Sequence, residues 1–378
     1  MTAHSHESML EVTSIPSPET RIKWGYAMAS IPDLPQTYGQ GCSQIRFTPG
    51  APMPGDILVA EVGFIGRHTR IDLIGAAKSN LFEGDLVGMV FAPRYATRQF
   101  QAIVPDSLDE VHFLCAGGVC GRVISIPDTM NQPTELLPVG YLLHPDGHRV
   151  NLRESARKPI PQDMAGIKVF VAVGSAMDSG KTTAAYSLIN GLTRAGVRVG
   201  AAKLTGTASA KDPRIMGDAG ADQVFDFTDF GFGSTADIEY GELEFIVDSA
   251  ISNLAAEDVD AIVLEVADGV TQRETMMMLK ILANRGADGA LYTCNDALGV
   301  CSGIDRVRKY GLNVLAVSGM VTSSTLSTQE ARNETDVPVL TREDLRNPAI
   351  AERLRVTPGG TKRLRDAWSG NDEDLVRV

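Results

Sequence analysis

The chain has 378 residues, more than one small core requires, and this length predicts two domains. The net charge of −12 argues against a protein that binds nucleic acid mainly through electrostatic attraction. No apolar stretch is long enough to cross a bilayer, and Met1–Ser17 lacks the basic and then apolar pattern of a secretory signal, so we expect a cytoplasmic protein without membrane contact.

The first half of the chain is predicted to be a small all-β barrel. Residues 1–20 are polar, contain Pro and Ser, and are expected to be disordered. Residues 21–145 contain short β-rich runs separated by Gly, Pro and Asp, with little helical periodicity. We expect a linker over residues 146–165. The predicted strands include Asp56–Val62, Leu86–Phe91, Gln99–Val104 and Gly121–Ile126.

Two arginine-rich segments, Gly66–Arg70 and Ala92–Arg98, are the sharpest features of this barrel. Arg and Tyr side chains on loops bind phosphate, carboxylate or a stacked ring, but any small barrel also carries them on its surface. The glycines of Cys115–Gly121 indicate a close backbone approach, which we place at a domain interface.

The cysteines are odd in number and form no C-x-x-C pair, which predicts free thiols in a reducing compartment. A metal site at Cys115 and Cys120 would need further ligands, and His112 is the only local candidate. The five cysteines are Cys42, Cys115, Cys120, Cys294 and Cys301.

Residues 166–356 alternate between strands and helices, which predicts a mostly parallel sheet with helices on both faces. Residues 357–378 are expected to be a flexible tail. The predicted strands are Ile167–Val173, Val197–Leu204, Ala261–Val266, Gly289–Thr293 and Val314–Ser318. The predicted helices are Thr182–Ala195, Leu243–Ala255, Glu274–Ala283 and Gly303–Tyr310.

Residues 174–183 read G-S-A-M-D-S-G-K-T-T and fit the phosphate-loop motif G-x-x-x-x-G-K-[ST], between a predicted strand and a predicted helix. This context places backbone N–H groups and the positive end of a helix around a polyphosphate. Lys181 is expected to reach the β- and γ-phosphates, and the Thr182 hydroxyl to bind Mg²⁺. The predicted nucleotide-binding residues of the loop are Gly174, Met177, Asp178, Ser179, Gly180, Lys181, Thr182 and Thr183.

Residues at the ends of later strands are candidates for the rest of the site. Glu265 is the first choice for the metal and Asp268 the second, although either acid could instead cap the following helix. Lys203 is expected to point into the ligand crevice and neutralise a transferring phosphoryl group, unless it is a surface lysine. Asn295 could hydrogen-bond a purine edge, or simply form a turn. The predicted catalytic residues are Lys181, Lys203 and Glu265.

The connection Asp212–Asp229 is rich in aspartate and is followed by the glycine-containing Gly231–Ser234. Such a connection suits a substrate loop or a switch that orders when nucleotide binds, and a plain solvated loop is an equal alternative.

Taken in order, these residues resemble the SIMIBI class of P-loop NTPases, which includes dethiobiotin synthetase, the cobyrinic acid amidases and the molybdopterin-guanine dinucleotide accessory proteins. The loop 174–183 resembles the synthetase's G-T-D-x-x-x-G-K-T, and Leu264–Gly269 resembles its E-G-A-G-G loop. Lys203 resembles the lysine that ends its second strand, and Asn295 its adenine-reading asparagine. The resemblance covers about residues 167–345, and the phosphate loop is its one highly specific motif.

The chain also departs from the synthetase. Ala176 replaces an Asp of the loop, and Val266 and Asp268 replace glycines that make room for substrate. Thr205–Thr207 replaces a proline-containing sequence, and the β-rich first half has no counterpart. These differences argue against biotin synthesis. The arrangement of the whole chain resembles that of a bacterial protein family that is defined by its P-loop domain.

The resemblance implies an enzyme that uses ATP and Mg²⁺ to phosphorylate a small acidic metabolite, of the ligase, synthetase or kinase type. GTP is the alternative nucleotide. The alternative function is a nucleotide-dependent switch or maturation chaperone whose barrel docks on a partner protein. A third hypothesis is an RNA-associated NTPase, against which the acidic balance counts. The oligomeric state stays open, with a homodimer among the alternatives.

Overall fold

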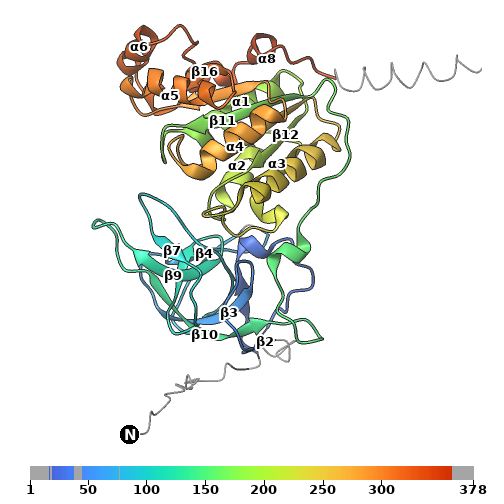
Figure 1. Ribbon diagram of the computed structural model, residues 1–378, viewed down its shortest axis with the longest axis vertical. Coiled ribbons are helices and arrows are strands. Elements are labelled where there is room, and N and C mark those ends of the chain that lie inside the picture. The colour runs from blue at the N-terminus through green and yellow to red at the C-terminus, as the bar shows by residue number, and fades with distance from the viewer. Residues whose placement is uncertain (1–16, 18, 38–44, 76, 360–378) are drawn as a thin grey trace, which may run out of the picture.

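The computed structural model describes residues 17, 19–37, 45–75 and 77–359. Most of the expected disordered N-terminus, the expected tail beyond residue 359, and Cys42 lie outside the described residues. A β domain and an α/β domain are stacked along the long axis of the molecule (Figure 1). Within the described ranges, none of the helices is both long and apolar enough to cross a membrane.

The first domain is a closed barrel, as the sequence predicts. Five strands form a ring in the order β6-β3-β10-β8-β9, and a parallel pairing of β6 with β9 closes it. Apolar side chains such as Leu58 and Phe113 fill its interior. The ring strands are β3 (Ile57–Phe64), β6 (Leu86–Phe91), β8 (Val111–Cys115), β9 (Val119–Ser125) and β10 (Thr134–Leu142).

Shorter elements extend the barrel. Strands β1, β2 and β7 pair with ring strands at their edges, and β4 pairs with β5 as a separate hairpin. Their bounds are β1 (Ile22–Trp24), η1 (Tyr26–Met28), β2 (Ile45–Arg46), β4 (Arg70–Asp72), β5 (Lys78–Asn80) and β7 (Gln101–Ile103).

The second domain contains a six-stranded sheet in the order β13-β12-β14-β11-β15-β16, and every strand pair in it is parallel. The strand before the phosphate loop, β11, therefore lies at the centre, between the strand that ends at Glu265 and the strand that ends at Thr293. The strands are β11 (Lys168–Gly174), β12 (Val199–Lys203), β13 (Gln223–Asp226), β14 (Ala261–Glu265), β15 (Gly289–Thr293) and β16 (Val314–Ser318).

Helices cover both faces of this sheet, which confirms the predicted α/β fold. Alternate side chains of β11 point to opposite faces, so that Val171 joins the cluster covered by α3, α4 and α5, and Phe170 joins the cluster covered by α1, α2, α7 and α8. The helices are α1 (Lys181–Arg194), α2 (Lys211–Asp218), η4 (Phe227–Phe230), α3 (Tyr240–Ala255), α4 (Arg273–Asn284), α5 (Leu298–Lys309), η5 (Met320–Thr322), α6 (Thr325–Asn333), α7 (Arg342–Arg346) and α8 (Ile350–Arg353).

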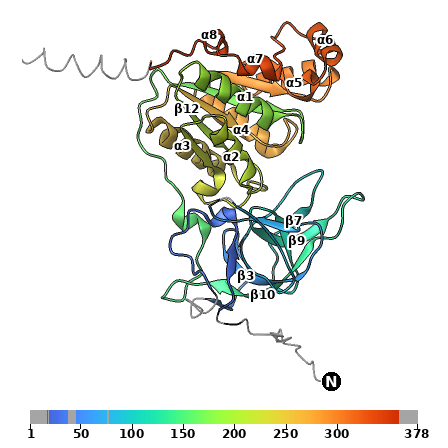
Figure 2. The same cartoon turned by 180° about the vertical axis from the view of Figure 1, so that it is seen from behind.

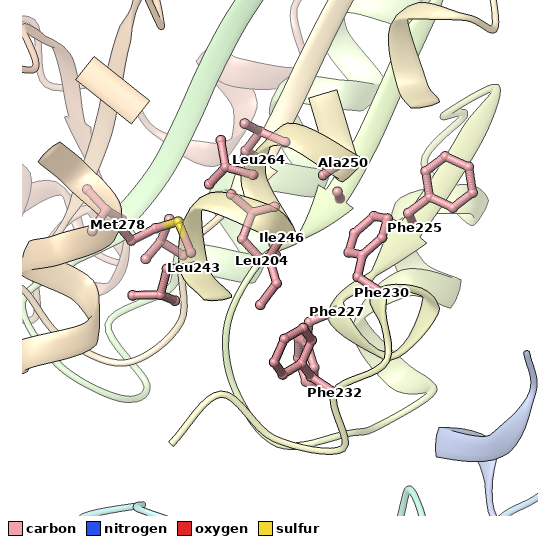
Figure 3. Packing of buried hydrophobic residues seen from close by; sticks show 14 of the residues in the cluster. Leu204, Phe225, Phe227, Phe230, Phe232, Leu243, Ile246, Ala250, Leu264 and Met278 are labelled. Carbon is pink, nitrogen blue, oxygen red and sulfur yellow. The ribbon is translucent and has the colours of Figure 1, made fainter. Parts of the chain in front are cut away.

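The alternative of a plain solvated loop over Asp212–Asp229 is wrong, because this connection holds α2, β13 and η4, whereas the alternative of a substrate loop or switch stays a prediction. Most of its acids have structural partners. The Asp212 carboxylate pairs with Lys203, and Asp226 and Asp229 form a capping box at the start of η4. The apolar residues between the acids anchor the segment: Figure 3 shows Phe225, Phe227, Phe230 and Phe232 beside Ile246 and Ala250 of α3.

The chain crosses between the domains along the side of α3 (Figures 1 and 2). The short helix η3 (Leu152–Ser155) lies in the segment expected to be a linker, and Leu152 is fully buried. Further on, the Asn253 amide donates to Lys158 O (3.0 Å), and Ile160 N donates to Ser252 Oγ (3.1 Å). The connection is therefore held against the second domain.

The two domains share one apolar cluster that runs from Met28 and Leu114 of the barrel to Ala208 and Phe227 of the second domain. The predicted close approach at Cys115–Gly121 is confirmed. A Cβ atom on Gly117 would lie 2.1 Å from Ala208 O, and the Cys115 thiol donates to the same oxygen at 3.1 Å.

Candidate functional site

The phosphate loop leaves the centre of the sheet and enters α1 through two glycines that the geometry requires. A Cβ atom on Gly174 would lie 2.1 Å from Ser179 Oγ and 2.4 Å from Thr293 Oγ1. Gly180 has a φ of +97°, and a Cβ atom there would lie 2.8 Å from Gly319 Cα. Since Gly180 is the N-cap and has no side chain to accept from the first turn of α1, those N–H groups are available to an anion.

The middle of the loop is partly exposed. Ser179 is buried and its hydroxyl lies 2.8 Å from Thr293 Oγ1, whereas Met177 and Thr183 are half-buried. Asp178 is exposed with a φ of +64°, and its carboxylate lies 3.3 Å from Arg98 Nη1 of the barrel. The barrel therefore reaches the phosphate loop directly.

Lys181 lies in the loop with its ammonium group turned back on the backbone. Its side chain is 7% exposed, and Nζ donates to Ala176 O at 2.7 Å. Burial lowers the pKa of Lys181, and the negative charges of Glu265 and Asp268 oppose this shift. The ammonium thus occupies the centre of the loop, which a phosphate group would share.

Thr182 and Glu265 meet at the start of α1. The Thr182 hydroxyl donates to Glu265 Oε1 at 2.6 Å, while Glu265 Oε2 is buried without a hydrogen-bond partner among the described residues. Burial raises the pKa of Glu265, and the positive charge of Lys203 is the strongest opposing influence. A buried carboxylate oxygen without a donor is the arrangement that a cation would satisfy.

Lys203 lies directly beside Glu265, because Lys203 of β12 is paired in register with Glu265 of β14 and with Asp226 of β13. Its Nζ also pairs with Asp212 of α2. Burial lowers the pKa of Lys203, but the charges of Asp212 and Glu265 outweigh burial and raise it overall. Lys203 is thus a buried cation within a group of acids, and not the surface lysine of the alternative interpretation.

Asp268 lies in the loop after β14 in a left-handed conformation, with a φ of +66°. Burial raises the pKa of its carboxyl group, and the charges of Lys181, Lys203 and Arg94 oppose the shift. The next residue, Gly269, packs on the phosphate loop, since a Cβ atom there would lie 2.5 Å from Ser175 O. Asp268 therefore faces the same charge cluster, together with an arginine from the barrel.

The expected base-binding residue, Asn295, lies on the side of the phosphate loop opposite to Glu265 and Asp268. Its side chain is exposed at the end of β15. Met320 N donates to Ser179 O at 3.0 Å, so the segment that follows β16 adjoins the phosphate loop. Within the described chain, the side chain of Asn295 makes no hydrogen bond. No such contact therefore assigns it a structural role.

A cavity of about 500 Å³ adjoins the first part of the phosphate loop. Its walls come from the phosphate loop, the start of α4 and the barrel segment 93–103. The arginine-rich segment Ala92–Arg98 therefore lies at the site, whereas the ring of His68 lies within the barrel, 5.6 Å from the ring of Phe100.

The structure brings Lys181, Thr182, Lys203, Glu265 and Asp268 into one cluster. Asp212 belongs to this cluster, but the sequence offered no signal for it beyond one acid among several. The participation of Arg94 depends on how the domains dock, which no local pattern encodes. Within the described chain, no three His, Cys, Asp or Glu side chains form a metal-binding group, so a cation here would also need oxygen atoms of a ligand.

The candidate site thus lies at the carboxyl ends of the strands, where open α/β sheets bind ligands. No family model matches the chain, and no curated protein matches it. The chain is similar to a solved structure of the signal recognition particle receptor FtsY from Elizabethkingia anophelis, at 15% identity over 55% of this chain and 74% of that chain, with a TM-score of 0.35.

Two further solved structures show similarity of the same order. A ParA family ATPase from Chlorobium tepidum is 12% identical over 46% of this chain and 83% of that chain, with a TM-score of 0.30. A nucleotide-binding protein from Archaeoglobus fulgidus, in complex with ADP, is 11% identical over 52% of this chain and 88% of that chain, with a TM-score of 0.32. At these values the similarity carries no conclusion about function.

Proposed function

We propose that the protein binds a nucleoside triphosphate with Mg²⁺ and transfers its γ-phosphoryl group to a small carboxylate. The observation that carries this proposal is the cluster of Lys181, Thr182, Lys203 and Glu265 around the phosphate loop, beside a cavity large enough for a metabolite. ATP is the expected nucleotide and GTP the alternative.

The phosphate loop supports the nucleotide part of the proposal. Backbone N–H groups at the start of α1 would donate to the phosphate oxygens, and the helix dipole favours their negative charge. Lys181 would exchange its bond to Ala176 O for bonds to the phosphates. Asn295 would contact the base, because it follows β15, which lies on the other side of β11 from β14 and the adjoining cavity.

The residues around Glu265 suit Mg²⁺, which prefers oxygen ligands and is usually held by one or two carboxylates together with phosphate groups. Thr182 and Glu265 would hold the ion directly or through water, since they already meet and Glu265 Oε2 has no donor. Asp268 is the second candidate. When bound, the ion would neutralise charge on the phosphate oxygens.

The proposed reaction needs positioning and charge stabilisation more than covalent chemistry. A carboxylate oxygen of the acceptor attacks the γ-phosphorus, the bond from that phosphorus to the β–γ bridging oxygen breaks, and its electron pair leaves with the nucleoside diphosphate. The product is an acyl phosphate. Lys203 would stabilise the charge on the transferring group, since its buried ammonium lies beside Glu265.

One contact favours the alternative of a nucleotide-dependent switch. The segment after Lys203 touches both the charge cluster, through Asp212, and the barrel, through Ala208 O and through Ala210 N, which donates to Asp72 at 3.2 Å. A movement of this segment on nucleotide binding would reach the barrel. The same contact is compatible with an enzyme, so the switch stays the second candidate.

We expect small carboxylates to stimulate the release of nucleoside diphosphate and to yield an acyl phosphate. The test is a coupled assay of ADP release with MgATP and a panel of monocarboxylates and dicarboxylates, with hydroxylamine present to trap the acyl phosphate as a hydroxamate. Stimulation together with hydroxamate supports phosphoryl transfer. Hydrolysis that no carboxylate stimulates and that yields no hydroxamate contradicts it, and leaves the switch as the better account.

A further inference from the structure

The cavity between the domains contains one charged group that the fold leaves without a counter-ion. Arg94, from the barrel, is 9% exposed, and among the described residues no carboxylate lies within ion-pair distance of it. One of its Nη atoms donates to Leu114 O, and its Nε is buried without a hydrogen-bond partner. A buried cation without a counter-ion is costly, so such groups usually pair with a ligand or a neighbouring acid.

The other charged groups of the cavity wall are already engaged. Arg273 lies 3.8 Å from Asp237 and 3.6 Å from Glu239, and Glu274 accepts a hydrogen bond from Asp237 N at 3.1 Å. Of the two arginines of the wall, Arg273 is therefore paired, and Arg94 is the one that an incoming anion would meet without an ion pair.

Arg94 is a desolvated cation in a mixed charge environment. Burial lowers the pKa of Arg94, Cys115 and Asp268 oppose that shift, and the positive charge of Arg67 on the neighbouring barrel loop adds to it by a smaller amount. Asp268, at the edge of the phosphate site, is close enough to oppose that shift. Arg94 thus connects the barrel wall of the cavity with the charge cluster around Lys181 and Lys203.

We propose that the barrel forms the acceptor site, and that the acceptor is a small dicarboxylate whose second carboxylate pairs with Arg94. This inference rests on the proposed phosphoryl transfer and names its substrate class. One carboxylate must lie near Lys203 to be phosphorylated, while the guanidinium of Arg94 offers planar donors to the other. A volume of about 500 Å³ suits a small metabolite of this kind.

The same guanidinium could bind an anionic oxygen of the nucleotide's terminal phosphate, and the two sources predict different results. If Arg94 binds the acceptor, its removal weakens the binding of the dicarboxylate and leaves the affinity for nucleotide intact. If Arg94 binds the terminal phosphate, its removal weakens the binding of ATP more than the binding of ADP.

The test uses the full chain with malonate, succinate and glutarate as probes. ADP release is measured against dicarboxylate concentration, and ATP and ADP affinities are measured by calorimetry, for wild type, Arg94→Met, Arg94→Lys and Arg70→Met. Arg70 is an exposed arginine of β4 outside the cavity wall and serves as the matched control.

At least one dicarboxylate should stimulate the wild type. Arg94→Met should raise the concentration for half-maximal stimulation by about tenfold or more, as expected for a lost charge-assisted hydrogen bond. Arg94→Lys keeps the charge without the planar donors, so it should show a smaller increase, and Arg70→Met should match the wild type. Thermal unfolding of each variant separates loss of the fold from loss of binding.

Three results would overturn the inference: no dicarboxylate affects the wild type, Arg94→Met responds as the wild type does, or Arg94→Met weakens ATP selectively. In each of these cases wild-type nucleotide binding stands. Absence of nucleotide binding by the wild type is a separate result, and it would refute the proposed function itself.

Discussion

Replacing Lys181 with alanine is expected to remove most of the affinity for nucleoside triphosphate. Its ammonium is the buried cation at the centre of the phosphate loop, and a hydrogen bond to a charged group contributes about 1.5–3 kcal/mol. This corresponds to a Kd weakened by about 10- to 100-fold, measurable by calorimetry with MgATP. Because burial lowers the pKa of Lys181, removal of this charge should not reduce the free energy of unfolding by a comparable amount.

Lys280→Ala is the matched control, since Lys280 is an exposed lysine on α4 of the same domain. It should bind MgATP as the wild type does. If Lys181→Ala retained wild-type affinity and wild-type hydrolysis, the loop 174–183 would not be a nucleotide site, whatever its sequence.

Replacing Glu265 with glutamine is expected to abolish Mg²⁺-dependent turnover while the nucleotide still binds. Glutamine keeps an acceptor for the Thr182 hydroxyl but removes the carboxylate charge that would hold the ion. Loss of one group that stabilises transition-state charge typically lowers kcat by about 10²–10³-fold. The rate of ADP release should fall by this order at saturating ATP and Mg²⁺, and recover in part at high Mg²⁺ concentration.

Nucleotide affinity in the presence of EDTA distinguishes a metal ligand from a structural residue. Without the ion, the Glu265 carboxylate repels phosphate, so Glu265→Gln should bind ATP in EDTA as well as the wild type or more tightly. Glu257→Gln, at an exposed position of the same domain, is the control. Turnover by Glu265→Gln equal to the wild type at every Mg²⁺ concentration would exclude Glu265 as a ligand and favour Asp268.

The parallel sheet was predictable from sequence because its strands are apolar along their whole length and are separated by clear helical spacing. The residue bounds of β15 and β16 agree with the prediction. The elements between Lys211 and Phe230 were missed because aspartates dominate the pattern there. Their acids are bound by Lys203 or by helix caps, which are tertiary and short-range contacts that composition does not reveal.

The barrel was recognisable as a class, but not strand by strand. Strand β10 contains Pro138 and two register shifts, so it lacks the clean alternation that marks a strand in sequence. Strand β8 is only five residues long and every one of them is buried, so it shows no alternation either.

The candidate site was predictable where one motif fixes the geometry. The phosphate loop implies a carboxylate on the neighbouring strand, and Glu265 lies there. The segment that contains Arg94 was a binding candidate from sequence, but it could not be placed at the phosphate loop, because that position depends on the docking of Gly117 and Cys115 against Ala208. Contacts between domains arise from long-range packing, which single-sequence patterns do not carry.

A crystal structure of the full chain with Mg²⁺ and a non-hydrolysable ATP analogue would show whether the loop 174–183 holds the nucleotide. We expect the phosphates to lie within this loop, Lys181 Nζ to have left Ala176 O for phosphate oxygens, and Mg²⁺ to lie at Thr182 and Glu265. An analogue bound elsewhere, with the bond from Lys181 to Ala176 intact, would contradict this expectation.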